Sequence, residues 1–202
     1  MKNYFSLYLV IPAAFIIGSI PFGVLITRTK GIDLQKAGSG NIGATNVLRT
    51  AGKIPALITL LGDALKGASA VLLCRLLSGG EFLEGLAGIT VVLGHMYSIF
   101  LSFKGGKGVS TGFGVMAVYG PMPAFISFVV WILTALYTRY SSVAAITAFL
   151  SLPVFFALLG NSMVKIYFAI LLGFLIILKH KQNIKRLIEG TETKIGGKLV
   201  NP

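Results

Sequence analysis

The sequence predicts an all-α, polytopic membrane protein with seven transmembrane helices, an N-terminus outside the cell and a C-terminus in the cytoplasm. Of its 202 residues, 55% are hydrophobic and only 12% are charged, whereas a soluble domain carries about 25% charged residues. The apolar runs are too long and too numerous to be the strands or buried helices of one soluble domain. In addition, the basic residues gather between the runs in a pattern that indicates the orientation of the chain.

Five apolar runs are clear transmembrane helices. The first, residues 4–26, resembles a secretory signal peptide because it is apolar after Lys2, but it lacks an obvious small-residue cleavage site and is long enough to span. We therefore expect it to be the first transmembrane helix. The other four runs are residues 55–77, 83–101, 143–159 and 164–178. We expect one domain over residues 1–202, with a flexible tail over residues 193–202.

The stretch of residues 109–137 allows two interpretations. As one segment it is long enough for a single tilted helix, but the sequence Gly-Pro-Met-Pro lies in its middle, at residues 120–123. Proline has no backbone N–H and clashes with the preceding turn, so a helix ends or kinks there. The alternative is two helices, residues 109–119 and 124–137, turning at Pro121. The first of these is too short to cross an ordinary bilayer unaided.

The distribution of charge decides between these interpretations, because a single helix gives six crossings and a broken one gives seven. With six crossings both termini share one side, and a group of cations lies outside whichever way the chain is oriented. With seven, the external ends hold only Lys2, Arg75 and Lys165, while Lys66 lies within a span. The positive-inside rule therefore favours seven crossings. The cytoplasmic cations are then Arg28, Lys30, Lys36, Arg49, Lys53, Lys104, Lys107, Arg139, Lys179, Lys181, Lys185, Arg186, Lys194 and Lys198.

Three short polar segments interrupt the apolar chain, each at the end of an apolar run. We name them the first island (residues 39–49), the second island (residues 103–110) and the third island (residues 179–186). With seven crossings all three lie on the cytoplasmic face, together with Ser142. Their hydroxyls, amides, cations and bare backbone N–H groups suit phosphate. We therefore expect the islands to form one phosphate-binding site.

The first island combines glycines, which let the backbone approach a ligand closely, with Arg49, a planar cation suited to bidentate phosphate binding. A glycine-rich loop before a helix, with its polar residues serving as caps, is the structural alternative. So many polar residues close together in a membrane protein favour binding. The other candidate binding residues of this island are Ser39, Gly40, Asn41, Gly43, Thr45 and Asn46.

The second island leads into a helix, where bare N–H groups and two lysines form an anion nest. It is not a Walker A loop, because Lys107 is followed by Gly108 and no matching glycine precedes it. A turn that follows the positive-inside rule is the structural alternative. The candidate binding residues are Lys104, Gly105, Gly106, Lys107 and Gly108.

In the third island, His180 and Asn183 fall on one helical face. A basic helix beside a membrane most often anchors to anionic lipid, but this pair indicates a binding role. Within the spans, Asp63 and Lys66 are costly in lipid and are expected to pair with each other or to face the bundle interior. His95 is either a structural hydrogen-bond partner or a supporting group of the site.

Composition and spacing exclude several other functions. The net charge of +12 fits positive-inside loops and an anionic substrate better than nucleic acid. Cys74 is the only cysteine, so the chain has no internal disulfide and no cysteine cluster for a metal, and we expect no metal or cofactor. Catalysis would rest on cations and donors that hold phosphates. The alternative is a small transporter for a phosphorylated or organic anion, although the islands lie on one face and not at mid-depth.

The ordered set of islands resembles the three signature motifs of the bacterial membrane-bound acyl-phosphate:glycerol-3-phosphate acyltransferases, the PlsY family. The motifs occur in the family's order and approximate spacing, and the resemblance covers nearly the whole chain. The matching segments are residues 39–46 with Arg49, residues 94–97 with 103–108, and residues 179–184 with 186–187 and 190–192.

The resemblance implies transfer of a fatty acyl group from acyl phosphate to the 1-hydroxyl of sn-glycerol 3-phosphate. The products are lysophosphatidic acid and phosphate, in the first membrane step of phospholipid synthesis in the bacterial inner membrane. It also implies seven helices, a lipid environment, independence from acyl-CoA and acyl-carrier protein, and a soluble upstream partner that makes acyl phosphate. By their place in the motifs, Ser39, Arg49, Lys104, Ser142, His180 and Asn183 would bind the phosphates, with the second-island glycines cradling them.

The implied catalytic residues are Ser39, Lys104, His180 and Asn183. Because both substrates carry phosphate and an acyl phosphate has a good leaving group, the protein needs mainly to hold two anions side by side. We expect no covalent acyl-enzyme, since the donor's own phosphate oxygen can take the hydroxyl proton; His180 as general base is the rival. Replacing Arg49 or Lys104 by alanine is expected to abolish activity.

Overall fold

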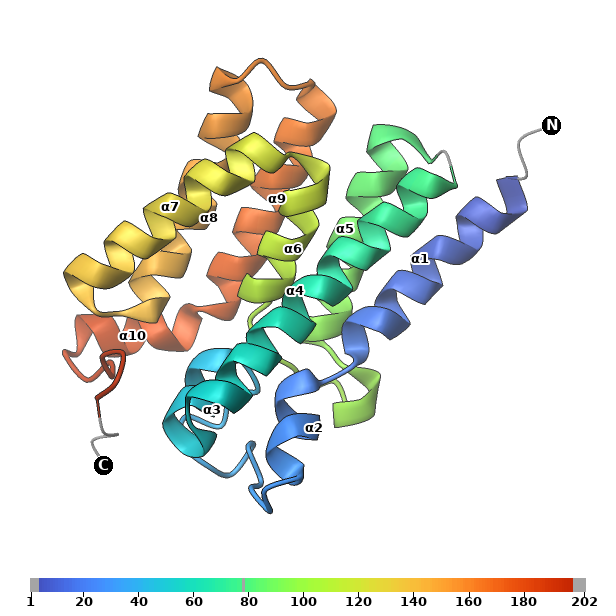
Figure 1. The fold of residues 1–202 in the computed structure, drawn as a ribbon. Coiled ribbons are helices and arrows are strands. Elements are labelled where there is room, and N and C mark those ends of the chain that lie inside the picture. Colours follow the sequence, from blue (N-terminus) through green and yellow to red (C-terminus); the bar gives the residue numbers. More distant parts are fainter. Residues whose placement is uncertain (1–3, 78, 198–202) are drawn as a thin grey trace.

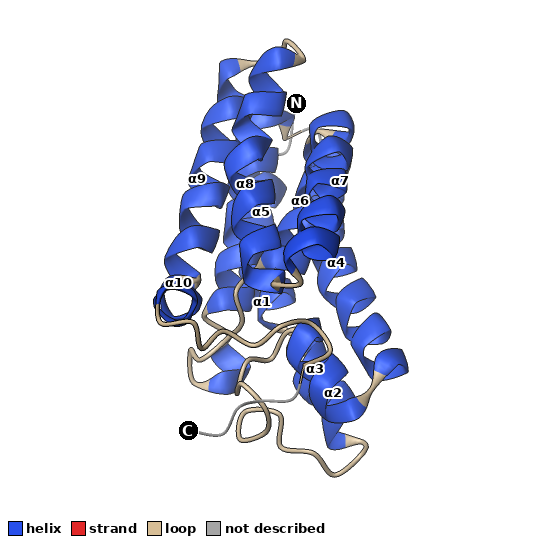
Figure 2. Ribbon diagram, turned by 90° about the vertical axis from the view of Figure 1, so that its left-hand side faces the viewer, coloured by secondary structure: helices blue, strands red, loops and turns tan. Residues whose placement is uncertain are grey.

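The computed structural model describes residues 4–77 and 79–197, and all regular structure in these two ranges is helical, as predicted (Figures 1 and 2). A short 3-10 helix, η1 (Ile99–Leu101), precedes the second island. The α-helices are α1 (Tyr4–Ser19), α2 (Phe22–Arg28), α3 (Ala44–Ala51), α4 (Lys53–Leu76), α5 (Gly80–Met96), α6 (Val109–Tyr119), α7 (Pro121–Thr138), α8 (Ser141–Leu158), α9 (Met163–Lys179) and α10 (Lys181–Ile188).

Length and composition give the described chain five helices that can cross a membrane, or six if α9 and α10, which meet at a bend of 58°, form one span. The remaining apolar helix, α6, has 11 residues. At 1.5 Å per residue it is about 16 Å long, against about 30 Å of hydrocarbon. The seven predicted crossings therefore depend on this short helix. The five spans are Leu9–Arg28, Lys53–Leu76, Gly80–Leu101, Pro121–Thr138 and Ser141–Leu158.

The helix break predicted at Pro121 is confirmed. α6 ends at Tyr119, and α7 begins directly at Pro121, a few residues before the predicted start at residue 124. Proline is well suited to the first position of a helix, because its missing N–H would have no helical partner there. The two helices therefore form separate elements.

A second break, which hydropathy alone did not predict, divides the first apolar run between α1 and α2. Pro21 lies at this break and supplies no N–H to continue the helix. The ammonium group of Lys66 on α4 donates a hydrogen bond to the carbonyl of Ile20 at 2.8 Å. A buried cation thus satisfies a backbone carbonyl that the break leaves without a helical donor.

Glycine allows the short helix α6 to pack closely on α4. A side chain at Gly114 of α6 would collide with the carbonyl of Ala64, and one at Gly67 of α4 would collide with the carbonyl of Thr111. Small residues at helix crossings let two backbones approach closely, which is the usual basis of helix association in membranes. The sequence thus places α6 in the interior of the bundle, where its buried face includes Val115.

Side-chain hydrogen bonds hold the C-terminal end of α6 against α4 and α5. Arg75 forms an ion pair with Glu84 at 2.6 Å and also donates to the carbonyl of Val118 at 3.0 Å. The hydroxyl of Tyr119 donates to the carbonyl of Glu81 at 2.9 Å. These contacts matter because an unpaired backbone carbonyl at membrane depth is costly.

Polar segments far apart in sequence gather at one end of the bundle. α2, α3, α10 and the loops around them lie together there (Figure 2), while the start of α1 lies at the opposite end (Figure 1). Residues 193–197, the first part of the predicted tail, contact this end: the Arg49 side chain donates to the Thr193 carbonyl at 3.0 Å, and the Ile195 N–H donates to the Arg139 carbonyl at 2.7 Å. Residues 198–202 lie outside the described residues.

Candidate active site

A cavity of about 560 Å³ lies at the polar end of the bundle, and all three islands contribute to its wall. The sequence-predicted residues that line it are Ser39, Asn41, Gly43, Thr45, Asn46, Arg49, Lys107, Gly108, Ser142, His180 and Asn183. Those that do not are Gly40, Lys104, Gly105 and Gly106. The structure therefore brings together segments separated by more than a hundred residues.

Asn46 organises the loop of the first island. Its side-chain N–H₂ donates to the carbonyls of Ala37 (3.0 Å) and Asn41 (2.8 Å), and its side-chain oxygen accepts from the Ser39 N–H at 2.9 Å. Asn46 is buried, and these bonds use its donors and its acceptor. Asn46 therefore shapes the binding loop. The polar groups that can meet a ligand in the cavity belong to the residues around it.

Helix α3 carries the first island's remaining polar groups into the cavity. Thr45 and Arg49 lie one turn apart on this helix, so they share a face. The Thr45 hydroxyl is 3.1 Å from that of Ser141, at the start of α8. Nε of Arg49 is buried and has no hydrogen-bond partner among the described residues. A buried guanidinium N–H with no protein acceptor at a cavity wall is available to an anionic ligand.

The second island docks on the end of α5. The N–H groups of Gly105 and Gly106 donate to the carbonyls of Met96 (3.2 Å) and His95 (3.0 Å). A side chain on Gly106 would collide with the imidazole of His95. These two glycines therefore hold the island against α5, and the predicted role of cradling phosphate does not fit their position.

The lysine that faces the cavity is Lys107, whereas the prediction favoured Lys104. Lys104 is exposed and lies outside the cavity wall. The turn is completed by Gly108, whose φ of +81° is in the left-handed region that favours glycine, immediately before α6 begins. Burial lowers the pKa of Lys107 to about 8, helped by Arg186 and Arg49 and opposed by Glu192.

His180 lies at the bend between α9 and α10 and is buried. Its Nδ1 lies 2.7 Å from the carbonyl oxygen of Ile176. Because a carbonyl only accepts, this contact assigns a proton to Nδ1. In the neutral imidazole Nε2 is then the acceptor, and the ring lines the cavity.

A carboxylate that was not among the predicted site residues, that of Glu192, also lines the cavity. One oxygen of Glu192 accepts from the Ser142 hydroxyl (2.7 Å) and from the Asn183 side chain (2.6 Å), while the other accepts from Arg186 (2.8 Å). Burial opposes ionisation of Glu192, but the hydrogen bonds from Asn183, Ser142 and Arg186 outweigh it and hold the pKa of Glu192 below its usual value. Groups predicted to bind phosphate thus already bind an anion.

Asp63, Lys66 and His95 form a buried cluster next to the cavity. The Lys66 ammonium lies 2.8 Å from the Asp63 carboxylate and 2.8 Å from Nδ1 of His95. The predicted pairing of Asp63 with Lys66 is therefore confirmed. The cluster joins α4 to α5, and both Asp63 and His95 line the cavity.

Removing one member of this cluster is expected to destabilise the fold. Lys66→Met leaves the Asp63 carboxylate buried without its cation, at a cost of about 3–5 kcal/mol. The double variant Asp63→Asn with Lys66→Met should recover much of this loss, because no charge is then left unpaired. Thermal unfolding of the purified protein in detergent measures both, and an unchanged midpoint for the single variant would contradict the expectation.

The cavity also has an apolar wall. Leu60 of α4, Phe113 of α6, and Phe128 and Trp131 of α7 line it. The rings of Phe128 and Trp131 are parallel, with centroids 6.1 Å apart. A polar end that carries cations therefore continues into an apolar part made by α4, α6 and α7. Such a site suits a molecule with a phosphate head and a hydrocarbon chain.

The family model described as "Glycerol-3-phosphate acyltransferase" matches residues 8–190 of this chain. The chain belongs to the glycerol-3-phosphate acyltransferase family. One relative, the glycerol-3-phosphate acyltransferase of Desulforamulus reducens, is 45% identical over 191 residues, which cover 94% of this chain and 96% of the relative. The protein of that name from Rubrobacter xylanophilus is 39% identical over 190 residues, covering 94% of this chain and 96% of the relative.

Solved structures agree with this membership in the glycerol-3-phosphate acyltransferase family. A crystal structure of PlsY (YgiH), an integral membrane glycerol 3-phosphate acyltransferase, in its glycerol 3-phosphate form has a TM-score of 0.90 at 41% identity, over 94% of this chain and 95% of that one. The lysophosphatidic acid form of PlsY gives 0.88 at the same identity. The resemblance seen in the three islands is thus confirmed, and membership in this enzyme family sets aside the transporter alternative.

Proposed function

We propose that this acyltransferase moves a fatty acyl group from acyl phosphate to the 1-hydroxyl of sn-glycerol 3-phosphate, releasing lysophosphatidic acid and inorganic phosphate. The observation that carries the proposal is the cavity itself, in which Arg49, Lys107 and hydrogen-bond donors at one end adjoin Phe113, Phe128 and Trp131 at the other. This arrangement matches a charged acyl donor with a long apolar tail. With this reaction the protein would act at the first membrane step of bacterial phospholipid synthesis.

The cationic end has the groups needed to hold two phosphates. Arg49 and Lys107 supply charge, and Ser39, Ser142 and Asn183 supply neutral groups around them. Fixed donors and cations lower the barrier when they match the charge that develops on the acyl oxygen and on the leaving phosphate. Holding the 1-hydroxyl against the acyl carbon adds the gain of proximity.

The transfer needs no nucleophilic side chain. The hydroxyl oxygen attacks the acyl carbon, the bond from that carbon to the phosphate oxygen breaks, and the hydroxyl proton passes to an oxygen of the donor's phosphate. His180 is the rival base, because the proton on its Nδ1 leaves Nε2 as an acceptor in the neutral ring. Recovery of acylated protein after incubation with acyl phosphate alone would contradict direct transfer.

We propose seven crossings, with the N-terminus outside and the active site on the cytoplasmic side of the bacterial inner membrane. The start of α1 and the segment after α10 lie at opposite ends of the bundle (Figure 1), which supports an odd number of crossings. The cations around α2, α3 and α10 support the cytoplasmic side. In a variant that lacks Cys74, a cysteine at exposed Lys30 should react with an impermeant thiol reagent in inverted vesicles and not in intact cells; the reverse pattern would overturn this orientation.

The donor is the decisive test. Purified protein given acyl phosphate and glycerol 3-phosphate is expected to form lysophosphatidic acid without added metal or coenzyme A, as mass spectrometry of the lipid product would show. Acyl-CoA or acyl-carrier protein in place of acyl phosphate should give no product, and turnover with either would contradict the proposed donor. Turnover should also occur when the added acyl phosphate is replaced by a soluble enzyme that makes it, supplied with that enzyme's own substrates.

A further inference from the structure

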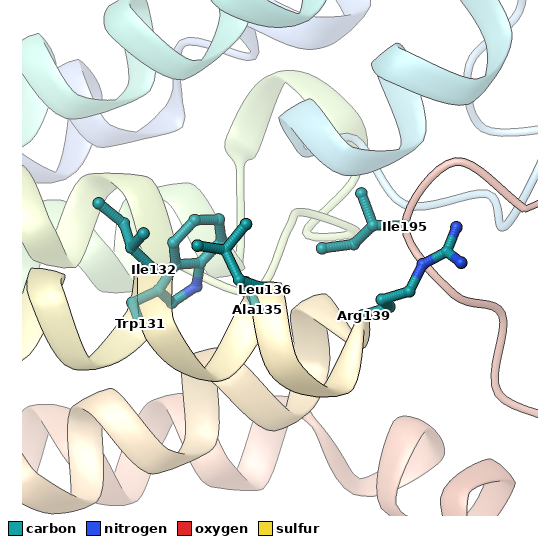
Figure 3. A pocket seen from close by; sticks show the side chains of 6 residues that line it. All are labelled: Trp131, Ile132, Ala135, Leu136, Arg139 and Ile195. Atoms are coloured by element: carbon teal, nitrogen blue, oxygen red, sulfur yellow. The ribbon is translucent and has the colours of Figure 1, made fainter.

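A second hollow, of about 380 Å³, lies along α7, next to the active-site cavity. We name it the α7 groove. Its side chains form a row along the helix, with the indole of Trp131 at one end and the guanidinium of Arg139 at the other (Figure 3). The residues that line it are Trp131, Ile132, Ala135, Leu136, Arg139 and Ile195.

The α7 groove and the catalytic cavity share a wall. Trp131 lines both, and its indole Nε1 is buried without a hydrogen-bond partner among the described residues. The C-terminal segment forms a second shared wall, because Thr193 faces the cavity while Ile195, two residues later, faces the groove. At this position the side chain of Trp131 stands between the groove and the active site.

The chemistry of the α7 groove is that of an amphiphile site. Its wall is aliphatic and aromatic, and it lies on a helix that is long and apolar enough to span the membrane. Its polar end is Arg139, which is exposed and caps α7 in a left-handed conformation (φ +62°). A non-glycine residue in this conformation is uncommon, and such residues concentrate at functional sites. A guanidinium beside an apolar row is complementary to a phosphate joined to one hydrocarbon chain.

We infer that the α7 groove is a docking site for acyl phosphate, from which the donor slides past Trp131 into the catalytic cavity. The inference rests on the proposed function. The donor is insoluble in water and must arrive from the bilayer, whereas glycerol 3-phosphate arrives from the aqueous side. Arg139 then holds the donor's phosphate at the membrane border while the chain lies along Ile132 and Leu136.

Substitutions at the polar end and in the middle of the α7 groove test this inference. Arg139→Gln removes the charge, and Ala135→Phe fills the groove at a residue that does not line the catalytic cavity. Both are expected to raise the KM for acyl phosphate, Arg139→Gln by about fivefold, the upper range for one solvent-exposed ion pair. The KM for glycerol 3-phosphate and kcat should stay unchanged. Arg139→Lys should stay close to the unsubstituted protein, and Arg28→Gln, at an exposed arginine that also ends a helix, is the matched control.

A binding measurement gives a readout that does not need turnover. Trp131 is the only tryptophan of the chain, so a long-chain alkyl phosphate brominated along its chain should quench the protein's tryptophan emission saturably. Half-maximal quenching should need about fivefold more probe in Arg139→Gln and the same amount in Arg28→Gln. Unchanged donor KM and unchanged quenching in Arg139→Gln and Ala135→Phe would overturn the inference, as would a lower kcat with unchanged donor KM. A protein that binds the probe but never uses acyl phosphate would instead overturn the proposed function.

Discussion

Replacing Arg49 by alanine is expected to lower kcat/KM by about 10²- to 10³-fold, the usual effect of losing one preorganised donor that stabilises developing charge. Arg49 stands on α3 at the wall of the cavity, and its Nε is buried without a hydrogen-bond partner among the described residues. Alanine removes both the charge and the planar donor set. Because alanine is also a good helix former, α3 is expected to remain helical. Initial rates with acyl phosphate and glycerol 3-phosphate measure the loss.

Arg49→Lys separates charge from geometry. Lysine keeps the positive charge but cannot bind one phosphate through two parallel N–H bonds, so it should recover only part of the lost rate. Because Arg49 also donates to the carbonyl of Thr193, the unfolding temperature of each variant in detergent is needed alongside the rates. A folded Arg49→Ala protein with normal turnover would remove this residue from the site.

Hydropathy and charge predicted much of the fold because the bilayer constrains the conformation of whole apolar segments and not only of single residues. A run of about 20 apolar residues is helical wherever it meets lipid, because its backbone N–H and C=O groups must bond to each other where there is no water. The break at Pro121 was visible for the same reason, because proline removes a helical donor. The bend at Pro21 was not predicted, since the apolar run continues on both sides of it and Lys66, far away in sequence, stabilises it.

The site was predicted as a set of segments but not atom by atom. Composition cannot distinguish Lys104 from Lys107, because both stand in one glycine-rich turn; the docking of Gly105 and Gly106 on α5 decides which lysine faces inward. Likewise, an amide near a phosphate site is counted as a ligand, whereas Asn46 is committed to its own loop.

Glu192 was missed for a physical reason as well. A carboxylate is not expected to lie where phosphates bind, because like charges repel. The structure balances it with Arg186 and with donors from Ser142 and Asn183. The one signal in the sequence was its place in the third motif, which a single chain reveals only by resemblance.

Lys107 should control how the reaction depends on pH. Burial lowers its pKa to about 8, and a lysine is charged below its pKa, so the free enzyme loses this cation as the pH rises through about 8. Because kcat/KM reports ionisations of the free enzyme, kcat/KM for glycerol 3-phosphate is expected to fall above that pH. Lys107→Arg should keep its activity to higher pH, since arginine stays protonated throughout.

Lys107→Ala and Lys104→Ala form a matched pair, because the two lysines stand three residues apart in the same turn. Lys107→Ala should lower kcat/KM by about 10²-fold or more, the loss expected for a partly buried charged group that binds the transition state. It should also abolish the fall of kcat/KM at high pH. Lys104 is exposed and lies outside the cavity wall, so Lys104→Ala should keep both its rate and its pH profile. If Lys104→Ala were the inactive variant, the cavity would not be the site where the phosphates are held.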